Sequence, residues 1–333
     1  MVEAVGAVVI GGGPCGLAAS VSMQRAGVAN VVIERDCLVS GITQYPTEMS
    51  FFSTAEKISI GGVPFAISTP KPTRAAALAY YRIVARYFGV KVHQYENVDL
   101  LEQCGDDRWR VTSHTRSGAE RVLETSAVVM ATGYFGLPNR LDVPGELQPH
   151  VSYRFREGHM AWDQDVVVVG GANSAVDAAL ELYRAGARVT IVHFAPGIDA
   201  NVKPWVRPDI EARIRDGSIG ARFDARVTQI GSDWVDIVVG GAPERIAAQH
   251  VFTMLGYMPE TGLLRQVDAP IDPETGIPTH DPATMETPLS GLYIAGVLAS
   301  GFDANKTFIE NGRFHGDLIV GRILEKQGQT AGV

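Results

Sequence analysis

Apolar residues along the chain gather in short β-branched runs, each followed by a glycine turn and then by a helical pattern. Residues 8–27 read VVIGGGPCGLAASVSMQRAG, and residues 167–186 read VVVGGANSAVDAALELYRAG. A second apolar run follows each segment, VVIE at 31–34 and VTIVH at 189–193. The two segments align without a gap at an offset of 159 residues. The order strand, glycine turn, helix, strand therefore occurs twice, which predicts two nucleotide-binding units.

The rest of the pattern indicates how the two units are joined. VVMATG (128–133) and GLYIAG (291–296) are apolar runs that end in glycine, and residues 227–254 alternate as antiparallel strands do. Breaks rich in proline and glycine lie at 136–149 and 256–262. We therefore expect an α/β fold with two Rossmann-like dinucleotide-binding domains. The predicted first domain covers 1–147 and 255–333, and the second, 148–254, is inserted into it.

Composition narrows the function classes. A length of 333 residues fits two domains. The net charge of −8 is spread along the chain without a lysine or arginine run, so we expect no nucleic-acid partner. No apolar run approaches the ~18 residues of a membrane span, and residues 1–6 do not resemble a secretory signal. The three cysteines form no CxxC pair, so a disulfide framework or metal site is not expected, and the predicted location is the cytoplasm.

The first glycine turn has the residue types that a dinucleotide pyrophosphate requires. Gly11 allows the tight turn, Gly13 lets the backbone approach the phosphates, and Gly16 allows the helix to pack closely on the strand. The start of the following helix offers free N–H groups to the phosphates. Glu34 ends the next strand and can accept hydrogen bonds from the adenosine ribose. Since the first site of a two-site chain usually holds FAD, we expect FAD here, and the ATG and GLYIAG segments support that assignment. The predicted FAD contacts of this domain are Gly11, Gly13, Pro14, Cys15, Gly16, Glu34, Arg35, Thr132, Gly133, Gly296 and Thr307.

The second glycine turn carries alanines in place of two glycines. Its residues are Gly170, Gly171, Ala172, Asn173, Ser174 and Ala175. His193 stands where an NAD-preferring site would carry an acid, so no carboxylate at that position accepts a 2′-hydroxyl or repels a 2′-phosphate. This favours NADPH as the second dinucleotide. Arg188, Lys203 and Arg207 are candidate phosphate contacts, although each is also a plausible solvated surface charge.

The layout of these motifs resembles the low-molecular-weight thioredoxin reductase family, but no cysteine lies near the second turn. A closer resemblance is to the bacillithiol disulfide reductase family, in the segments GGGPCG (11–16), YPTEMSFFSTAEKISIGGVPF (45–65), KPWVRPDI (203–210) and NKTFIENGRFHG (305–316). This resemblance implies an FAD-containing, NADPH-dependent oxidoreductase that reduces the disulfide of a small-molecule thiol without a CxxC motif. It also implies a homodimer or homotetramer.

The family resemblance assigns roles to three residues of this sequence. It places the proposed redox cysteine at Cys15, and it adds Gln44 and Lys306 to the predicted FAD contacts. Cys15 lies in the first turn of a helix, where N–H dipoles would lower the pKa of a thiol. The alternative is that Cys15 only fills space in the turn, and the sequence leaves both interpretations open.

Other function classes stay open as well. A ferredoxin- or flavodoxin-NADP reductase of the thioredoxin reductase-like type also lacks CxxC, although the tail EKQGQTAGV (325–333) has no aromatic residue to stack on a flavin. A flavin-dependent monooxygenase would fit the two turns, but the residues around His159 do not match its motif. A non-catalytic binding module would predict a disrupted first turn, which is intact here.

Overall fold

The computed structural model describes residues 2–328, and the last five residues of the tail considered above lie outside this range. The chain divides into two compact units. One comprises residues 1–43, 49–137 and 257–333, and the other comprises residues 44–48 and 138–256. The assignment of FAD to the first unit and of a nicotinamide dinucleotide to the second stays a prediction. Among the described residues, no helix is both long and apolar enough to cross a membrane.

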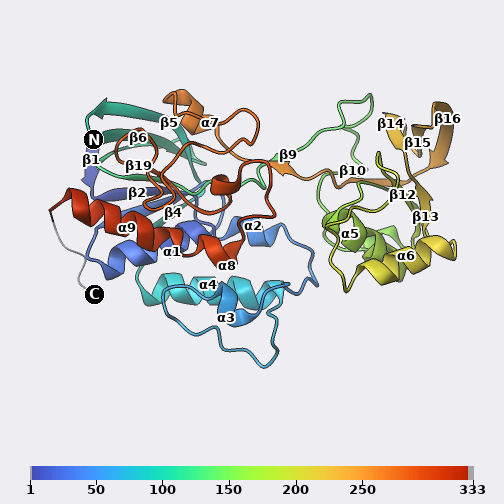
Figure 1. The fold of residues 1–333 in the computed structure, drawn as a ribbon, viewed down its shortest axis with the longest axis horizontal. Coiled ribbons are helices and arrows are strands. Elements are labelled where there is room, and N and C mark those ends of the chain that lie inside the picture. Colours follow the sequence, from blue (N-terminus) through green and yellow to red (C-terminus); the bar gives the residue numbers. More distant parts are fainter. Residues whose placement is uncertain (1, 329–333) are drawn as a thin grey trace. The chain divides into compact units, whose positions relative to one another are not determined.

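A five-stranded parallel sheet forms the centre of the first unit, with the strand order β19-β8-β2-β3-β4. Its strands are β2 (Ala7–Ile10), β3 (Asn30–Glu34), β4 (Val92–Gln94), β8 (Val128–Met130) and β19 (Leu292–Ile294). Val8 and Val9 are fully buried, as expected for a parallel strand covered on both faces. On one face lie α1 (Pro14–Arg25) and α9 (His315–Lys326), which pack against each other (Figure 1).

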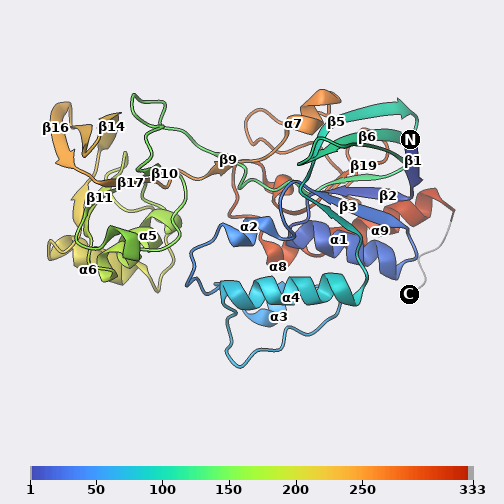
Figure 2. The same ribbon diagram turned by 180° about the vertical axis from the view of Figure 1, so that it is seen from behind.

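The other face of this sheet is covered by four strands in the order β1-β7-β6-β5. These are β1 (Val2–Val5), β5 (Glu96–Gly105), β6 (Arg108–Thr115) and β7 (Glu120–Thr125). Trp109 of β6 is fully buried between the layers, and its indole N–H donates to the carbonyl of Ser290 at 3.0 Å. The remaining elements are α2 (Ser40–Thr43), α3 (Ala55–Ile58), α4 (Arg74–Tyr87), α7 (Gly262–Gln266), the 3-10 helix η2 (Gly296–Ser300) and α8 (Ile309–Gly312). Figure 2 shows α4 along the same side of the unit as α1.

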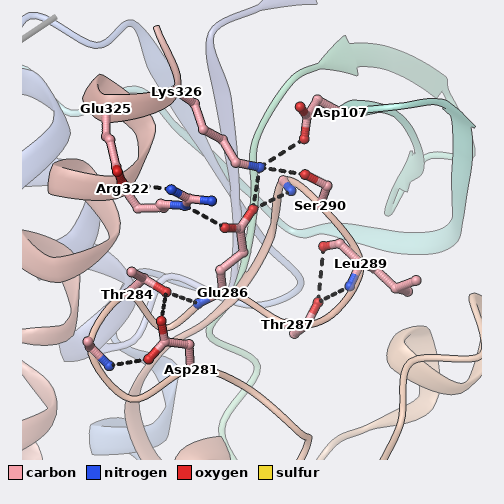
Figure 3. A network of polar contacts seen from close by, with 12 residues as sticks. Asp107, Asp281, Thr284, Glu286, Thr287, Leu289, Ser290, Arg322, Glu325 and Lys326 are labelled. Atoms are coloured by element: carbon pink, nitrogen blue, oxygen red, sulfur yellow. Dashed lines mark hydrogen bonds and ion pairs between the residues drawn. The ribbon is translucent and has the colours of Figure 1, made fainter. Parts of the chain in front are cut away.

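Charged residues fix α9 to its neighbours in the first unit (Figure 3). The Glu286 carboxylate accepts hydrogen bonds from the backbone N–H of Gly291 at 2.9 Å and from Arg322 Nε at 2.8 Å. It also accepts from the ammonium group of Lys326, which in turn contacts Asp107 at 2.9 Å. Glu286 is largely buried; desolvation acts to raise its pKa, but these donors outweigh it and hold the pKa below its usual range. The carboxylate is therefore ionised where it binds Arg322 and Lys326 of α9.

The second unit repeats the layered plan. Its parallel sheet has the order β10-β17-β11-β12-β13. One face packs against α5, and the other packs against the antiparallel sheet β14-β15-β16. The elements are β10 (Val151–Ser152), η1 (His159–Ala161), β11 (Asp165–Val169), α5 (Asn173–Arg184), β12 (Arg188–Val192), α6 (Arg207–Arg215), β13 (Gly220–Arg222), β14 (Ala225–Ile230), β15 (Trp234–Val239), β16 (Ala242–Ala247) and β17 (His250–Thr253). Where the chain passes between the units, β9 (Leu137–Pro138) and β18 (Tyr257–Met258) form a two-stranded sheet.

The repeat in the sequence is also a repeat in the fold. Helix α5 begins and ends 159 residues after α1, and each helix follows the central strand of its parallel sheet. Alternating valines explain how one strand serves two faces: Val166 and Val168 pack on α5, while Val167 and Val169 pack on the antiparallel strands. The predicted α/β fold with two Rossmann-like units is thus confirmed. Of the antiparallel strands expected over 227–254, β17 instead joins the parallel sheet.

Candidate nucleotide-binding sites and Cys15

Of the three motif glycines in the first turn, Gly13 leaves room for a ligand, whereas Gly11 and Gly16 do not. A Cβ added at Gly11, where φ is +106°, would lie 2.3 Å from the carbonyl oxygen of Ala131. One added at Gly16 would lie 2.0 Å from the carbonyl oxygen of Gly11. At Gly13 a Cβ would meet nothing within 4 Å, so this backbone faces open space. Gly11 and Gly16 are therefore required by packing, whereas Gly13 is free to admit a ligand.

The start of α1 has the properties of an anion site. Its N-cap is Gly13, and no side chain of the described residues caps it. The N–H groups of a helix's first turn otherwise lack partners, and the helix dipole favours a negative group there. A pyrophosphate at the open face of Gly13 would satisfy both. The turn therefore fits the phosphates of a dinucleotide.

Glu34 connects the glycine turn to the end of β3. Its side chain is buried, and one carboxylate oxygen accepts the N–H of Gly12 at 2.7 Å. The other oxygen accepts the N–H of Asp36 at 2.9 Å and the hydroxyl of Ser40 at 3.2 Å. A carboxylate has about four acceptor positions, so capacity remains for a ribose hydroxyl. Both oxygens are held in place before any ligand arrives.

The remaining predicted FAD positions separate into two groups. Glu260 contacts three of them. Its carbonyl accepts the Thr132 hydroxyl at 2.8 Å, and its N–H donates to the Gly133 carbonyl at 3.0 Å. Its carboxylate pairs with Arg35 at 3.2 Å. Our sequence reasoning missed Glu260, which lies within the second inter-domain break, 256–262. Gln44 belongs to the second unit, where it accepts a hydrogen bond from Arg156 at 3.0 Å.

The C-terminal segment brings Gly296 next to the first turn. Its φ is +73°, and its N–H donates to Nδ1 of His315 at 3.1 Å. Desolvation lowers the pKa of His315 to about 4, so the ring is neutral near pH 7 and can accept this bond. Nearby, Thr307 shares a hydrogen bond with Ser300, while Lys306 is exposed and 3.6 Å from Asp303. His315 was part of the NKTFIENGRFHG segment but was not singled out from the sequence.

Cys15 is the second residue of α1, as predicted, but its environment is the reverse of the expected one. Cβ atoms added at Gly312 and at Gly296 would lie 2.9 Å and 3.2 Å from its Sγ, so both glycines are needed beside the thiol. Burial raises the pKa of the Cys15 thiol to about 12. The expectation that the helix dipole lowers this pKa is therefore wrong for the protein without ligands, because desolvation disfavours the thiolate more strongly. Cys37 and Cys104 are also free cysteines.

The second glycine turn has the same geometry as the first. Gly170 has φ +135°, and a Cβ there would lie 2.5 Å from the carbonyl oxygen of Met254. Ala172 is the N-cap of α5, again without a side-chain cap among the described residues. The Asn173 side chain instead joins the turn to the following loop, accepting the N–H of Lys203 at 3.0 Å. Gly171, Ala175 and Ser174 complete this turn, with Ser174 exposed.

His193 takes the place that Glu34 has in the first unit. It lies 159 residues after Glu34, it is 3% exposed, and it packs on Gly171 so closely that a Cβ there would lie 2.5 Å from the ring. Neither ring nitrogen has a hydrogen-bond partner among the described residues. Asp199, which our sequence reasoning missed, places a carboxylate oxygen 3.7 Å from its Nε2. The expectation that no carboxylate is available at this turn therefore needs correction.

The three predicted phosphate-binding cations differ in their surroundings. Arg188 is at the amino end of β12, paired with Asp163 and Asp165 at 2.6 Å each. Nucleotides bind at the carboxyl ends of such strands, so the suggestion for Arg188 is wrong. Arg207 donates to the carbonyl of Asp199 and pairs with Glu211 at 2.8 Å. Lys203 lies in the loop next to the turn. No group of three or more His, Cys, Asp or Glu among residues 2–328 is arranged to hold a metal ion.

Comparison with known proteins places these sites in context. The family described as pyridine nucleotide-disulphide oxidoreductase matches residues 8–296. The chain is 41% identical over 323 residues to bacilliredoxin reductase Bdr of Bacillus subtilis (strain 168), covering 96% of this chain and 98% of that protein. The solved structure of bacillithiol disulfide reductase Bdr from Bacillus cereus is 42% identical, with a TM-score of 0.95 over 97% of this chain and 100% of that one. A thioredoxin reductase from T. acidophilum shares the fold at 18% identity, with a TM-score of 0.76 over 98% and 100% of the two chains.

Proposed function

The chain belongs to the pyridine nucleotide-disulphide oxidoreductase family, and on that premise we propose that it reduces the disulfide of a low-molecular-weight thiol with electrons from NADPH. It is an enzyme that uses a flavin and a nicotinamide cofactor. The observation that carries the substrate class is the near-full-length likeness to relatives named for bacillithiol disulfide and bacilliredoxin reduction. The resemblance inferred from the sequence motifs is confirmed by the same likeness.

FAD, when bound, carries two electrons between the nicotinamide and the disulfide. The residues of the first turn fit it: the open backbone at Gly13 admits the pyrophosphate, and the uncapped start of α1 offers N–H groups to it. Glu34 is already oriented by Gly12 and Asp36 and would accept a ribose hydroxyl. These residues bind and orient the cofactor.

Cys15 is our candidate for the residue that reacts with the disulfide. Its Sγ lies beside Gly296 and Gly312, next to the turn that would hold the flavin's phosphates. In the proposed step, Sγ attacks one sulfur of the disulfide, a mixed disulfide forms, and the first thiol leaves. The proton of Cys15 leaves with that first thiol, and two electrons and two protons then release the second thiol and restore the Cys15 thiol. Because burial raises the pKa of the Cys15 thiol to about 12, Sγ is protonated near pH 7 and must lose its proton as it attacks.

His193 favours NADPH because it occupies the position of Glu34 without its negative charge, whereas the Asp199 carboxylate 3.7 Å from its Nε2 acts in the opposite direction. The second turn offers the uncapped start of α5 to the phosphates, as the first turn does. Lys203 and Arg207 stay as proposed contacts, with Arg207 already engaged by Asp199 and Glu211. The proposed site of action is the cytoplasm, and the proposed assembly is a homodimer or homotetramer, which light scattering of the purified protein tests.

A steady-state assay tests the proposed function. The FAD-loaded enzyme is given NADPH with bacillithiol disulfide, with oxidised glutathione, or with a ferredoxin or flavodoxin. We expect two thiols released for each NADPH oxidised, and fastest with bacillithiol disulfide. The alternative, a ferredoxin- or flavodoxin-NADP reductase, predicts electron transfer to those proteins and none to disulfides. That outcome would replace the proposed function.

A further inference from the structure

Arg226 lies close to the end of β12, where an adenosine would bind at the second turn. The strand β14 starts at Ala225, whose N–H donates to the His193 carbonyl at 3.0 Å, and the N–H of Asp224 donates to the Ala195 carbonyl at 3.0 Å. These bonds hold β14 against the residues that follow β12. In β14, Ala225 and Val227 are buried and Arg226 is exposed. Its guanidinium is therefore on the solvent side of this junction.

An aromatic ring lies beneath this guanidinium. The Arg226 guanidinium carbon is 5.5 Å from the centre of the Phe194 ring, and Phe194 is 60% exposed although it directly follows the buried His193. Phe194 also lies against the His193 ring, with 4.7 Å between the two ring centres. An arginine over an aromatic ring is held in place by the cation–π interaction and keeps its N–H groups for other partners.

The charge of Arg226 distinguishes it from its neighbours. Arg222 is bound by Glu244 at 2.8 Å, and Arg207 is bound by Glu211 at 2.8 Å. Within residues 2–328, no carboxylate lies within ion-pair distance of Arg226. Arg226 thus combines an uncompensated charge with a defined position at the carboxyl edge of the sheet. Such a group fits a phosphate dianion.

We propose that Arg226, supported by Phe194, recognises the 2′-phosphate of an adenosine at the second turn and sets the preference for NADPH over NADH. This inference rests on the proposed function and deepens it. Asp199 acts against the phosphate, because its carboxylate lies 3.7 Å from His193 at the same turn and is the natural acceptor for a 2′-hydroxyl. The balance between Arg226 and Asp199 therefore sets the cofactor preference.

Isothermal titration of the FAD-loaded enzyme with 2′,5′-ADP and with 5′-AMP tests this assignment, because the two probes differ only in the 2′-phosphate. We expect the wild type to bind 2′,5′-ADP more tightly. Arg226→Gln should weaken 2′,5′-ADP binding by about 10- to 100-fold, the range of one charge-assisted contact, and 5′-AMP binding by less than about 3-fold. Asp199→Asn should strengthen 2′,5′-ADP binding.

Arg222→Gln is the matched control, since it removes an equal charge that Glu244 already compensates. It should leave the ratio of the two affinities unchanged. Equal affinities of the wild type for both probes, or an equal loss of both in Arg226→Gln, would overturn the inference. A further measurement separates this outcome from failure of the proposed function. Arg226→Gln is reduced with dithionite, without any nicotinamide, and is then mixed with bacillithiol disulfide. Reoxidation of this variant shows that the disulfide reductase activity is intact whatever the result of the titrations.

Discussion

Replacing Glu34 by glutamine would test whether the first glycine turn holds FAD. The substitution keeps the size of the side chain but replaces one acceptor oxygen with an NH₂ donor. In the wild type the two oxygens accept the N–H groups of Gly12 at 2.7 Å and Asp36 at 2.9 Å. A glutamine can accept only one of them, and its NH₂ group then faces the other.

The magnitude follows from these contacts. A buried donor left without a partner costs about 1–3 kcal/mol, and Glu34 is only 6% exposed. The apoprotein should therefore lose about that much free energy of unfolding. A hydrogen bond from a ribose hydroxyl to an ionised acceptor contributes about 1.5–3 kcal/mol. Since about 1.4 kcal/mol corresponds to tenfold in affinity, the Kd for FAD should rise by about 10- to 100-fold.

Two measurements check this prediction. Flavin fluorescence during titration of the apoprotein gives the Kd for FAD, and thermal denaturation of the apoprotein gives the change in stability. Glu124→Gln is the matched control in the same unit, because it makes the same charge change at a carboxylate that pairs with Arg108 and Arg110 on the surface. If Glu34→Gln binds FAD as tightly as this control, the assignment of FAD to the first turn is refuted.

Other substitutions and a labelling experiment test the glycine turn, the Glu286 network and Cys15. Gly13→Ala should leave the stability of the apoprotein unchanged or slightly higher but should weaken FAD binding. Gly16→Ala should destabilise the apoprotein in thermal denaturation, because its Cβ would lie 2.0 Å from the Gly11 carbonyl oxygen. Equal behaviour of the two variants would contradict the geometry. Glu286→Ala should lower the free energy of unfolding by about 3 kcal/mol, the low end for a broken buried ion pair, because Arg322 and Lys326 keep other partners. The folded-state pKa of Glu286 is depressed, so its contribution to the free energy of unfolding should be present above about pH 4.5 and should disappear as the pH falls further. If urea denaturation shows no such pH-dependent difference between wild type and variant, this prediction is wrong. In the apoprotein at pH 8, iodoacetamide should alkylate exposed Cys104 far faster than Cys15, because the pKa of Cys15 is raised to about 12. Peptide mass spectrometry measures the two rates, and the reverse order would show that desolvation does not protect the Cys15 thiol.

The sequence predicts the fold well because its strongest signals are local and repeated. The β-branched runs and glycine turns place β2, α1, β11 and α5, since each element is specified by its own residues. The contacts of Glu260 and His315 could not be read in this way, because each depends on segments far apart in the chain. Glu260 meets Arg35 and Thr132 only after the chain returns from the second unit.

Charges and burial were the least predictable properties of the candidate sites. The helix position of Cys15 suggested a lowered thiol pKa, but the packing of Gly296 and Gly312 around Sγ depends on the tertiary fold. At the second turn, the replacement of an acid by His193 was visible in the sequence, whereas Asp199 reaches the same turn through the following loop. Spacing alone does not reveal where such a loop places a carboxylate.

Stopped-flow absorbance of the FAD-loaded enzyme tests the central claim most directly. The enzyme is first reduced with one equivalent of NADPH and then mixed with bacillithiol disulfide, for the wild type and for Cys15→Ala. Our account predicts that both proteins are reduced by NADPH at similar rates, and that the disulfide rapidly reoxidises the wild type but not Cys15→Ala. Equally fast reoxidation of both would contradict the role of Cys15, and a disulfide that reoxidises neither would contradict the proposed disulfide reductase function itself.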